Sequence, residues 1–169
     1  FTFNTSELMP IGLLSDIVAV FGVCAAYAGW LITVYAWVVA LLSLPLMLLC
    51  ARMDFRRVML IIVSVFFISH AGSVMATGFW TLLASRIGVA CAHAVFWSIA
   101  PSMAVAVAPG KERATALSVM VAGGGIAMVA GLPLGRLLGL VAGWRVTFAV
   151  LGALAGLILY GIFRTVPSI

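Results

Sequence analysis

Long apolar runs, separated by short clusters of charged residues, Pro and Gly, fill almost the whole chain. Hydrophobic residues make up 66% of its 169 residues, and charged residues only 8%. A soluble domain is about 45–50% apolar and about 25% charged, so a chain of this size in water has too little interior to bury its apolar surface. Several runs approach the roughly 20 residues that a helix needs to cross a bilayer. The sequence therefore predicts an all-α membrane protein.

Charged residues, Pro and Gly divide these runs into six expected transmembrane helices. No segment alternates polar and apolar residues with the period of two that marks a half-buried strand. The first run is short and starts at Phe1, so we expect a truncated first helix and a chain that is a fragment. Residues 15–26 should form a weakly amphipathic connection. The expected helices cover residues 1–14, 27–49, 58–76, 81–107, 114–141 and 146–163.

The basic residues are concentrated in one of the two alternating sets of loops. Arg145 is alone in the other set. Cytoplasmic loops of membrane proteins carry an excess of Lys and Arg, so loops 51–57 and 109–113 should be cytoplasmic. The net charge of +5 does not indicate nucleic-acid binding, because these cations form no continuous basic face. The first set contains Arg52, Arg56, Arg57, Lys111, Arg113 and Arg164.

A few polar side chains lie within the expected spans, where each carries a free-energy cost and needs a reason. Asn4 and Glu7 are three residues apart and therefore share a helix face. Arg86 and His93, seven residues apart, also share a face, and Trp97 continues that face one turn beyond His93. Glu7 can exist in its neutral form near physiological pH, since burial disfavours the charged carboxylate. The alternative is a structural hydrogen bond or an ion pair, for instance to Arg86, which would then tie two helices together. His93 could relay the proton or bind a polar substrate, or could simply be a packed side chain.

The fifth expected helix has a stripe of small residues at four-residue intervals, along which another helix can pack closely. Prolines inside the spans predict bends, which membrane helices tolerate when neighbouring groups satisfy the freed carbonyls. The stripe is Gly123, Ala127, Gly131, Gly135 and Gly139, and the prolines are Pro10, Pro45, Pro101 and Pro133.

These features resemble the amino-terminal half of the major facilitator superfamily. In that family the loop after the second helix carries a Gly-x-Leu-Ala-Asp-Arg-x-Gly-Arg-Lys type motif, and residues 52–60 keep its final cation pair and the Leu. Residue 86 matches the Arg of the fourth-helix motif. Residues 131–135, Gly-Leu-Pro-Leu-Gly, resemble the Gly-Pro-x-x-Gly end of the antiporter motif. The resemblance implies gating or structural roles for Arg52, Arg56, Arg57, Arg86, Gly131, Pro133 and Gly135.

Within this superfamily, nearly the whole chain is similar to bacterial sugar efflux transporters of the drug:proton antiporter branch. The similarity rests on residues 3–7, 12–17, 35–41, 85–94 and 131–136. It implies a twelve-helix protein of the bacterial inner membrane, in which proton entry drives export of arabinose, related sugars or other small molecules. Residues 1–169 would be its amino-terminal six-helix domain. Its expected partners are the lipid bilayer, the proton, a small-molecule substrate, and a second six-helix half from the same gene or another copy.

In that fold the first and fourth helices line a central cavity, whereas the third and sixth lie outside it. The resemblance therefore implies that Glu7 and His93 face the cavity as proton-coupling groups and that His70, on the third helix, does not. It also implies substrate contacts for Asn4, Tyr35, His93 and Trp97.

Other functions remain open. A multidrug efflux antiporter of the same branch would show the same pattern, and an inactive half-transporter or scaffold would need no coupling site. A bis-histidine haem protein would use His70 and His93, although their expected depths differ. An intramembrane hydrolase lacks its Gly-x-Ser-x-Gly signature. We expect no enzymatic activity, no cofactor and no metal site, and Cys24, Cys50 and Cys91, which lack metal-ligand spacing, should act as small apolar residues.

The charge distribution makes a prediction about orientation. In a background without the native cysteines, a cysteine introduced in loop 52–57 or 111–113 should react with a membrane-impermeant thiol reagent only from the cytoplasmic side. A cysteine at Thr77, in a turn of the opposite set, should react only from outside. Labelling of the two basic loops from outside would reverse the predicted topology.

Overall fold

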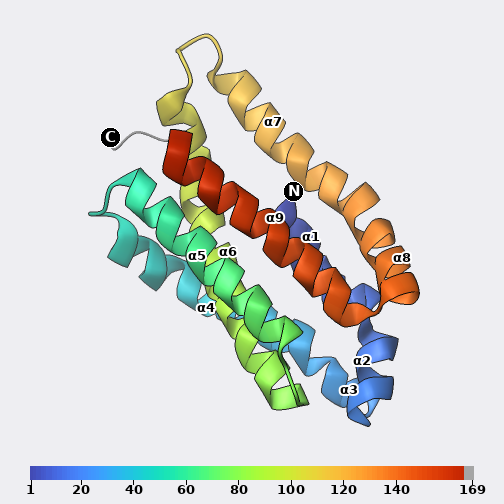
Figure 1. Ribbon diagram of the computed structural model, residues 1–169. Helices are drawn as coiled ribbons and strands as arrows, with labels where there is room; N and C mark the ends of the chain where they lie inside the picture. Colours follow the sequence, from blue (N-terminus) through green and yellow to red (C-terminus); the bar gives the residue numbers. More distant parts are fainter. Residues whose placement is uncertain (166–169) are drawn as a thin grey trace.

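The computed structural model describes residues 1–165 and is a bundle of helices (Figure 1). Five helical stretches are long and apolar enough to cross a membrane. Two of them combine shorter elements, because α3 runs directly into α4, and a π-helical turn, η1, joins α7 to α8. The five stretches are α3 and α4 (Ala25–Ala28 and Trp30–Cys50), α5 (Phe55–Val74), α6 (Phe79–Val107), α7, η1 and α8 (Arg113–Ile126, Ala127–Gly131 and Leu132–Ala142), and α9 (Trp144–Thr165).

The first expected span consists of α1 (Thr2–Gly12) and α2 (Leu14–Phe21), which meet at Leu13. The prediction that residues 15–26 form a connection was wrong for most of that range, because helix continues to Phe21 before the left-handed Gly22 ends it. Burial explains the extension: Ile17 of α2 is fully buried, one turn after the buried Leu13, so the helix continues along a packed face. With this segment the described residues form six helical segments, five of which are long and apolar enough to cross a membrane.

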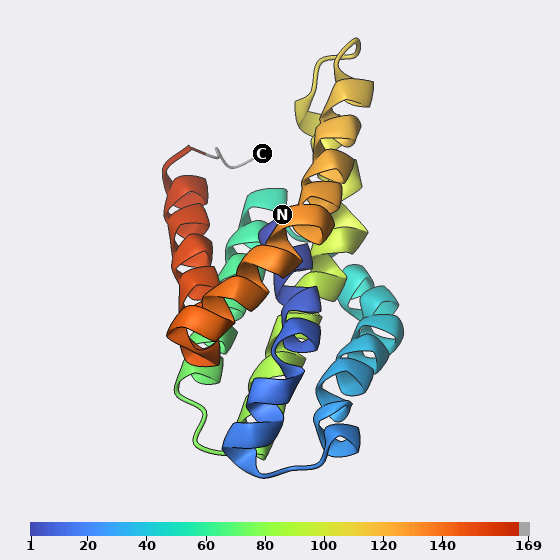
Figure 2. The same cartoon turned by 90° about the vertical axis from the view of Figure 1, so that its right-hand side faces the viewer.

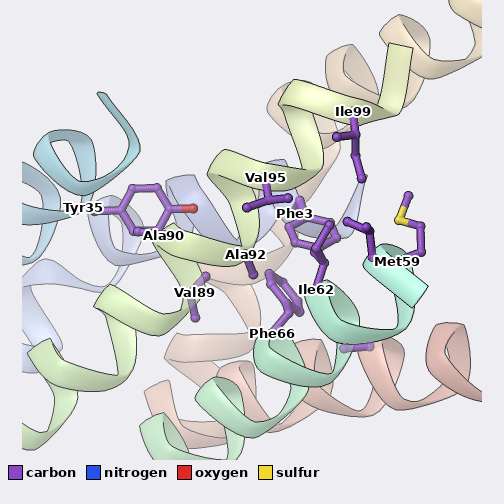
Figure 3. Packing of buried hydrophobic residues seen from close by; sticks show 12 residues of the cluster. Phe3, Tyr35, Met59, Ile62, Phe66, Val89, Ala90, Ala92, Val95 and Ile99 are labelled. Atoms are coloured by element: carbon purple, nitrogen blue, oxygen red, sulfur yellow. The ribbon is translucent and has the colours of Figure 1, made fainter. Parts of the chain in front are cut away.

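Helix α6 packs against both α4 and α5, while α5 packs along α9, and α1 packs against η1 and α8. The ring of Phe3, from α1, lies 4.2 Å from that of Phe66 in α5 and 4.4 Å from that of Phe96 in α6, measured between centroids. Figure 3 shows Phe3 among the apolar side chains of these two helices. Aromatic packing thus fixes α1 in the interior of the bundle, while α5 and α9 form a pair on one side.

The small-residue stripe of the fifth span is where α1 packs closely, as predicted (Figure 2). A Cβ atom added to Gly131 would lie 3.2 Å from Cβ of Thr5, which is tighter than ordinary contact. One added to Gly135 would overlap the end of Met9, and one added to Gly139 would overlap Leu13. The absence of side chains therefore sets the distance between the two helices.

Two of the four prolines coincide with irregular helix. Pro10 lies one turn before the break at Leu13, whose N–H contacts two carbonyls, those of Met9 and Pro10. Pro133 lies two residues after the end of η1, and a π-helical turn is a common local solution where the regular hydrogen-bond ladder is interrupted. Pro45 and Pro101 lie inside α4 and α6, which continue through them as α-helix.

The packing of α1 on the stripe makes a prediction about stability. Gly131→Leu or Gly135→Leu should lower the free energy of unfolding by about 1–3 kcal/mol or more, because the new side chain overlaps α1. Thermal unfolding of the purified protein in detergent measures this loss.

Gly125→Leu is the matched control, because Gly125 lies on the same span with open space around its Cβ position. It should unfold close to the wild-type temperature. Equal losses at Gly125 and Gly135 would show that a general effect of Leu in this span, and not the overlap with α1, is responsible.

Candidate functional site

Three side chains from three helices form a line that runs from the exposed face of α1 into the interior of the bundle. A carboxylate oxygen of Glu7, in α1, lies 3.7 Å from Nε2 of His93, in α6. The other ring nitrogen of His93, Nδ1, lies 2.7 Å from the hydroxyl of Tyr35, in α4. Tyr35 and His93 are buried, whereas 45% of the Glu7 side chain is exposed. Glu7 is therefore the accessible end of the line and Tyr35 its buried end.

Asn4 and Trp97 lie beside this line. The indole Nε1 of Trp97 donates a hydrogen bond to Oδ1 of Asn4, with 3.0 Å between the atoms. The Trp97 ring lies 6.4 Å from that of His93, and both Asn4 and Trp97 are only partly buried. An aromatic surface, an amide and a carboxylate thus adjoin one another, and such groups can contact a polar small molecule.

Arg86 belongs to a second, fully buried network. Its Nη2 donates to the backbone carbonyl of Ser6 at 2.7 Å and its Nη1 to the Ser6 hydroxyl at 3.1 Å. Its guanidinium also lies over the rings of Tyr35 and Phe148, at 5.0 and 5.7 Å. Within residues 1–165 no ion pair joins Arg86 to Glu7. Arg86 therefore ties α6 to α1 through neutral acceptors, and the alternative of an Arg86–Glu7 pair was wrong.

His70 completes the second network. Its Nε2 lies 2.9 Å from the Ser6 hydroxyl and its Nδ1 2.9 Å from the carbonyl of Phe66. The ring is fully buried among α1, α5 and α9. Because both nitrogens have protein partners, His70 has no free position for a haem iron, and it lies away from the Glu7 carboxylate.

Basic residues at the ends of the helices contact neighbouring segments. Arg56 donates to the carbonyl of Phe163 at 3.1 Å, which links the start of α5 to the end of α9. Arg57 pairs with Asp54 at 3.2 Å in a solvent-exposed contact, which contributes little to stability. Arg52 is exposed. These contacts give Arg56 a structural position, and none of the three lies near Glu7.

The opposite end of the bundle has its own ion pair. Arg136, in α8, lies 3.1 Å from a carboxylate oxygen of Asp16, in α2, and also donates to the Gly12 carbonyl at the break between α1 and α2. The negative charge of Asp16 is thereby balanced by the guanidinium of Arg136. Among the acidic residues of the helical segments within residues 1–165, Glu7 is the one without an Arg or Lys contact.

Sequence reasoning missed Ser6, which accepts two hydrogen bonds from Arg86 and contacts His70. A serine in a membrane helix is common, and helical spacing within one segment gives no sign of partners on two other helices. The available signal was the position of His70 and Arg86 inside apolar runs, because polar side chains at membrane depth require hydrogen-bond partners.

Comparison with known proteins places this geometry in a family. The model of the Major Facilitator Superfamily matches residues 1–168. Probable sugar efflux transporters from Helicobacter pylori strain P12 and Helicobacter acinonychis strain Sheeba are 46% and 47% identical to the chain over 169 residues. The chain is covered completely in both comparisons but spans only 43% of each relative's length.

Solved structures share the fold. A bacterial homologue of the human lysosomal transporter Spinster superimposes on 99% of the chain in two inward-facing conformations. The TM-score is 0.78 at 24% identity for the unoccupied conformation, and 0.83 at 22% identity for the occupied one. The chain covers 41% and 42% of those chains, respectively. Its sequence and its fold thus agree, and the chain belongs to the Major Facilitator Superfamily, a family of membrane transporters and not of enzymes.

Proposed function

We propose that the chain is the amino-terminal half of a transporter that exports sugars or similar polar small molecules in exchange for protons. The observation that carries this proposal is the position of Glu7, a half-exposed carboxyl group within an apolar helix of the bundle, with His93 as its ionisable neighbour. An intramembrane carboxyl group is costly and is characteristic of proton pathways. The similarity to probable sugar efflux transporters supports the substrate class.

The distribution of buried and exposed side chains on α1 supports the presence of a second half of the transporter. Its Ser6, Met9 and Leu13 are buried in the bundle, while Glu7 and Ile11 are exposed on the opposite face. A polar, exposed helix face at membrane depth needs either water or another protein surface beside it. The greater length of the relatives agrees with a partner half that closes a cavity over this face. The whole protein would then reside in the bacterial inner membrane, with loops 51–57 and 109–113 in the cytoplasm.

In this mechanism the charge of Glu7 sets the preferred orientation of the two halves. The ionised carboxylate needs a polar surrounding and favours the conformation in which water reaches it. Protonation removes the charge and lowers the cost of closing the cavity on that side. Alternating protonation from the two sides of the membrane would therefore alternate the access to Asn4, His93 and Trp97, the proposed substrate contacts.

Two alternatives give different experimental results. A multidrug antiporter would use the same Glu7 but would transport apolar cations, and sugars would not compete with that transport. An inactive half-transporter or scaffold, which the partial coverage of the relatives leaves open, would show no transport when combined with a complementary half.

The main prediction concerns Glu7→Gln in a full-length transporter that contains this half. Gln keeps the size and much of the hydrogen bonding of Glu but cannot release a proton. Substrate binding in detergent should persist, while export against a gradient, driven by a pH difference, should be lost. Downhill exchange should remain. Proton-driven uptake into inside-out vesicles is the measurement.

Glu112→Gln is the matched control, because Glu112 is exposed in the loop before α7. It should leave pH-driven uptake unchanged. Normal uphill transport by the Glu7→Gln protein would exclude Glu7 as the coupling site and leave His93 as the candidate.

A separate prediction concerns His93→Ala. Removal of the imidazole deletes the contacts to both Glu7 and Tyr35 and should weaken substrate binding or shift the pH profile of transport. An unaltered binding constant together with an unaltered pH profile would remove His93 from the site.

A further inference from the structure

Both ring nitrogens of His93 have a neighbour, and this limits the chemistry of the ring. Nδ1 lies 2.7 Å from the Tyr35 hydroxyl, and Nε2 faces the Glu7 carboxylate at 3.7 Å. A neutral imidazole has one N–H group, so one nitrogen acts as a donor and the other as an acceptor. The partners decide which nitrogen carries the hydrogen.

The Tyr35 hydroxyl has one hydrogen-bond partner in the described part of the chain, Nδ1 of His93. Tyr35 is only 4% exposed. If Nδ1 carried the hydrogen, the hydroxyl would accept it and its own proton would be buried without an acceptor, which is unfavourable. If the hydroxyl donates to Nδ1 instead, the buried tyrosine proton has an acceptor, and the Nε2–H group faces the Glu7 carboxylate 3.7 Å away.

The charges around the ring favour the same arrangement. The ionised carboxylate of Glu7, from α1, attracts an Nε2–H group and repels a lone pair at that position. Arg86, from α6 itself, lies 5.0 Å from the centre of the Tyr35 ring and disfavours a second positive charge on His93. His70, from α5, is engaged with Ser6 and Phe66.

We propose that Tyr35 is a positioning residue, which donates its hydroxyl proton to Nδ1 of His93 and holds that ring as the Nε2–H tautomer. His93 then presents a fixed N–H group to the Glu7 carboxylate and is not a second proton carrier. Nδ1 is the one ring nitrogen at which neutral His93 can take up a proton, and Tyr35 occupies it. The inference deepens the proposed function and rests on it in taking Glu7 as the coupling group. It also replaces two sequence-based hypotheses, proton relay by His93 and substrate contact by Tyr35.

The tautomer can be measured without transport. In a full-length transporter containing this half, labelled with ¹⁵N-histidine, the His93 signals are those that disappear in the His93→Gln variant. We expect a protonated Nε2 and an unprotonated, hydrogen-bonded Nδ1 both above and below the pH optimum of transport. A protonated Nδ1 in the wild-type protein would overturn the proposal.

Tyr35→Phe should move the Nδ1 signal toward that of a free acceptor and allow Nδ1 to be protonated at low pH. Tyr27→Phe is the matched control, since the Tyr27 side chain is exposed on α3 and should leave both His93 signals in place. An unchanged Nδ1 signal in Tyr35→Phe contradicts the hydrogen bond. Should Tyr35→Phe not fold, the wild-type tautomer and the His93 variants below still decide.

Transport gives an independent test. The amide nitrogen of Gln can donate from the position of Nε2 but cannot carry a proton at neutral pH, so His93→Gln should recover most of the pH-driven export that His93→Ala loses. Equal loss in both variants would mean that His93 itself carries the proton. For Tyr35→Phe we expect KM within about twofold of wild type with a shifted pH profile of kcat. A raised KM with an unchanged pH profile would make Tyr35 a substrate contact.

These outcomes separate the inference from the proposed function. If Glu7→Gln transports uphill normally while His93 remains the Nε2–H tautomer, the coupling role of Glu7 fails and the role of Tyr35 stands. If Glu7→Gln abolishes coupling while wild-type His93 has a protonated Nδ1, the coupling role of Glu7 stands and the positioning role of Tyr35 fails.

Discussion

Arg86 brings a positive charge into the interior of the bundle, where no carboxylate of the described chain contacts it. Its two hydrogen bonds to Ser6 and its position over the rings of Tyr35 and Phe148 are what allow that charge to be buried. Removal of the Arg86 guanidinium or of its Ser6 hydroxyl partner would leave a buried polar group without its hydrogen-bond partner. Because Ser6 is in α1 and Arg86 in α6, the rotation of α1 about its own axis is fixed by this contact, and the direction of Glu7 with it.

The neighbouring residues Ser6 and Glu7 illustrate how one helix serves two purposes. Ser6 faces inward to Arg86 and His70, in a network with neutral acceptors and full burial. Glu7 faces His93 and remains half exposed, so a proton can reach it. The glycine stripe on η1 and α8 supports this division, since the close approach of Thr5, Met9 and Leu13 seats the buried face of α1. Structure and proposed coupling therefore depend on the same few turns of helix.

The two histidines differ for a physical reason that neither composition nor spacing indicates. His70 lies between two helices that pair along their length, and its nitrogens are used by Ser6 and a backbone carbonyl. His93 lies on the central helix, with a titratable side chain on each side of its ring. The same side chain is thus a structural element in one position and part of the candidate site in the other.

The sequence alone determined the class of the protein. Its apolar runs predicted the five later helical segments to within a few residues, since a lipid environment leaves few other ways to satisfy the backbone. The four-residue spacing of glycines predicted a close helix contact, because helical periodicity places these residues on one face. The same periodicity put Asn4 beside Glu7 and His93 beside Trp97.

Only the tertiary structure decided which faces meet. Helical spacing relates residues of one segment, whereas the contacts of Arg86 with Ser6, Tyr35 with His93, and Arg136 with Asp16 each join different helices. The extension of helix to Phe21 also required knowledge of what buries Ile17. These features depend on the relative rotation and depth of the helices, and those follow from side-chain packing across the whole bundle.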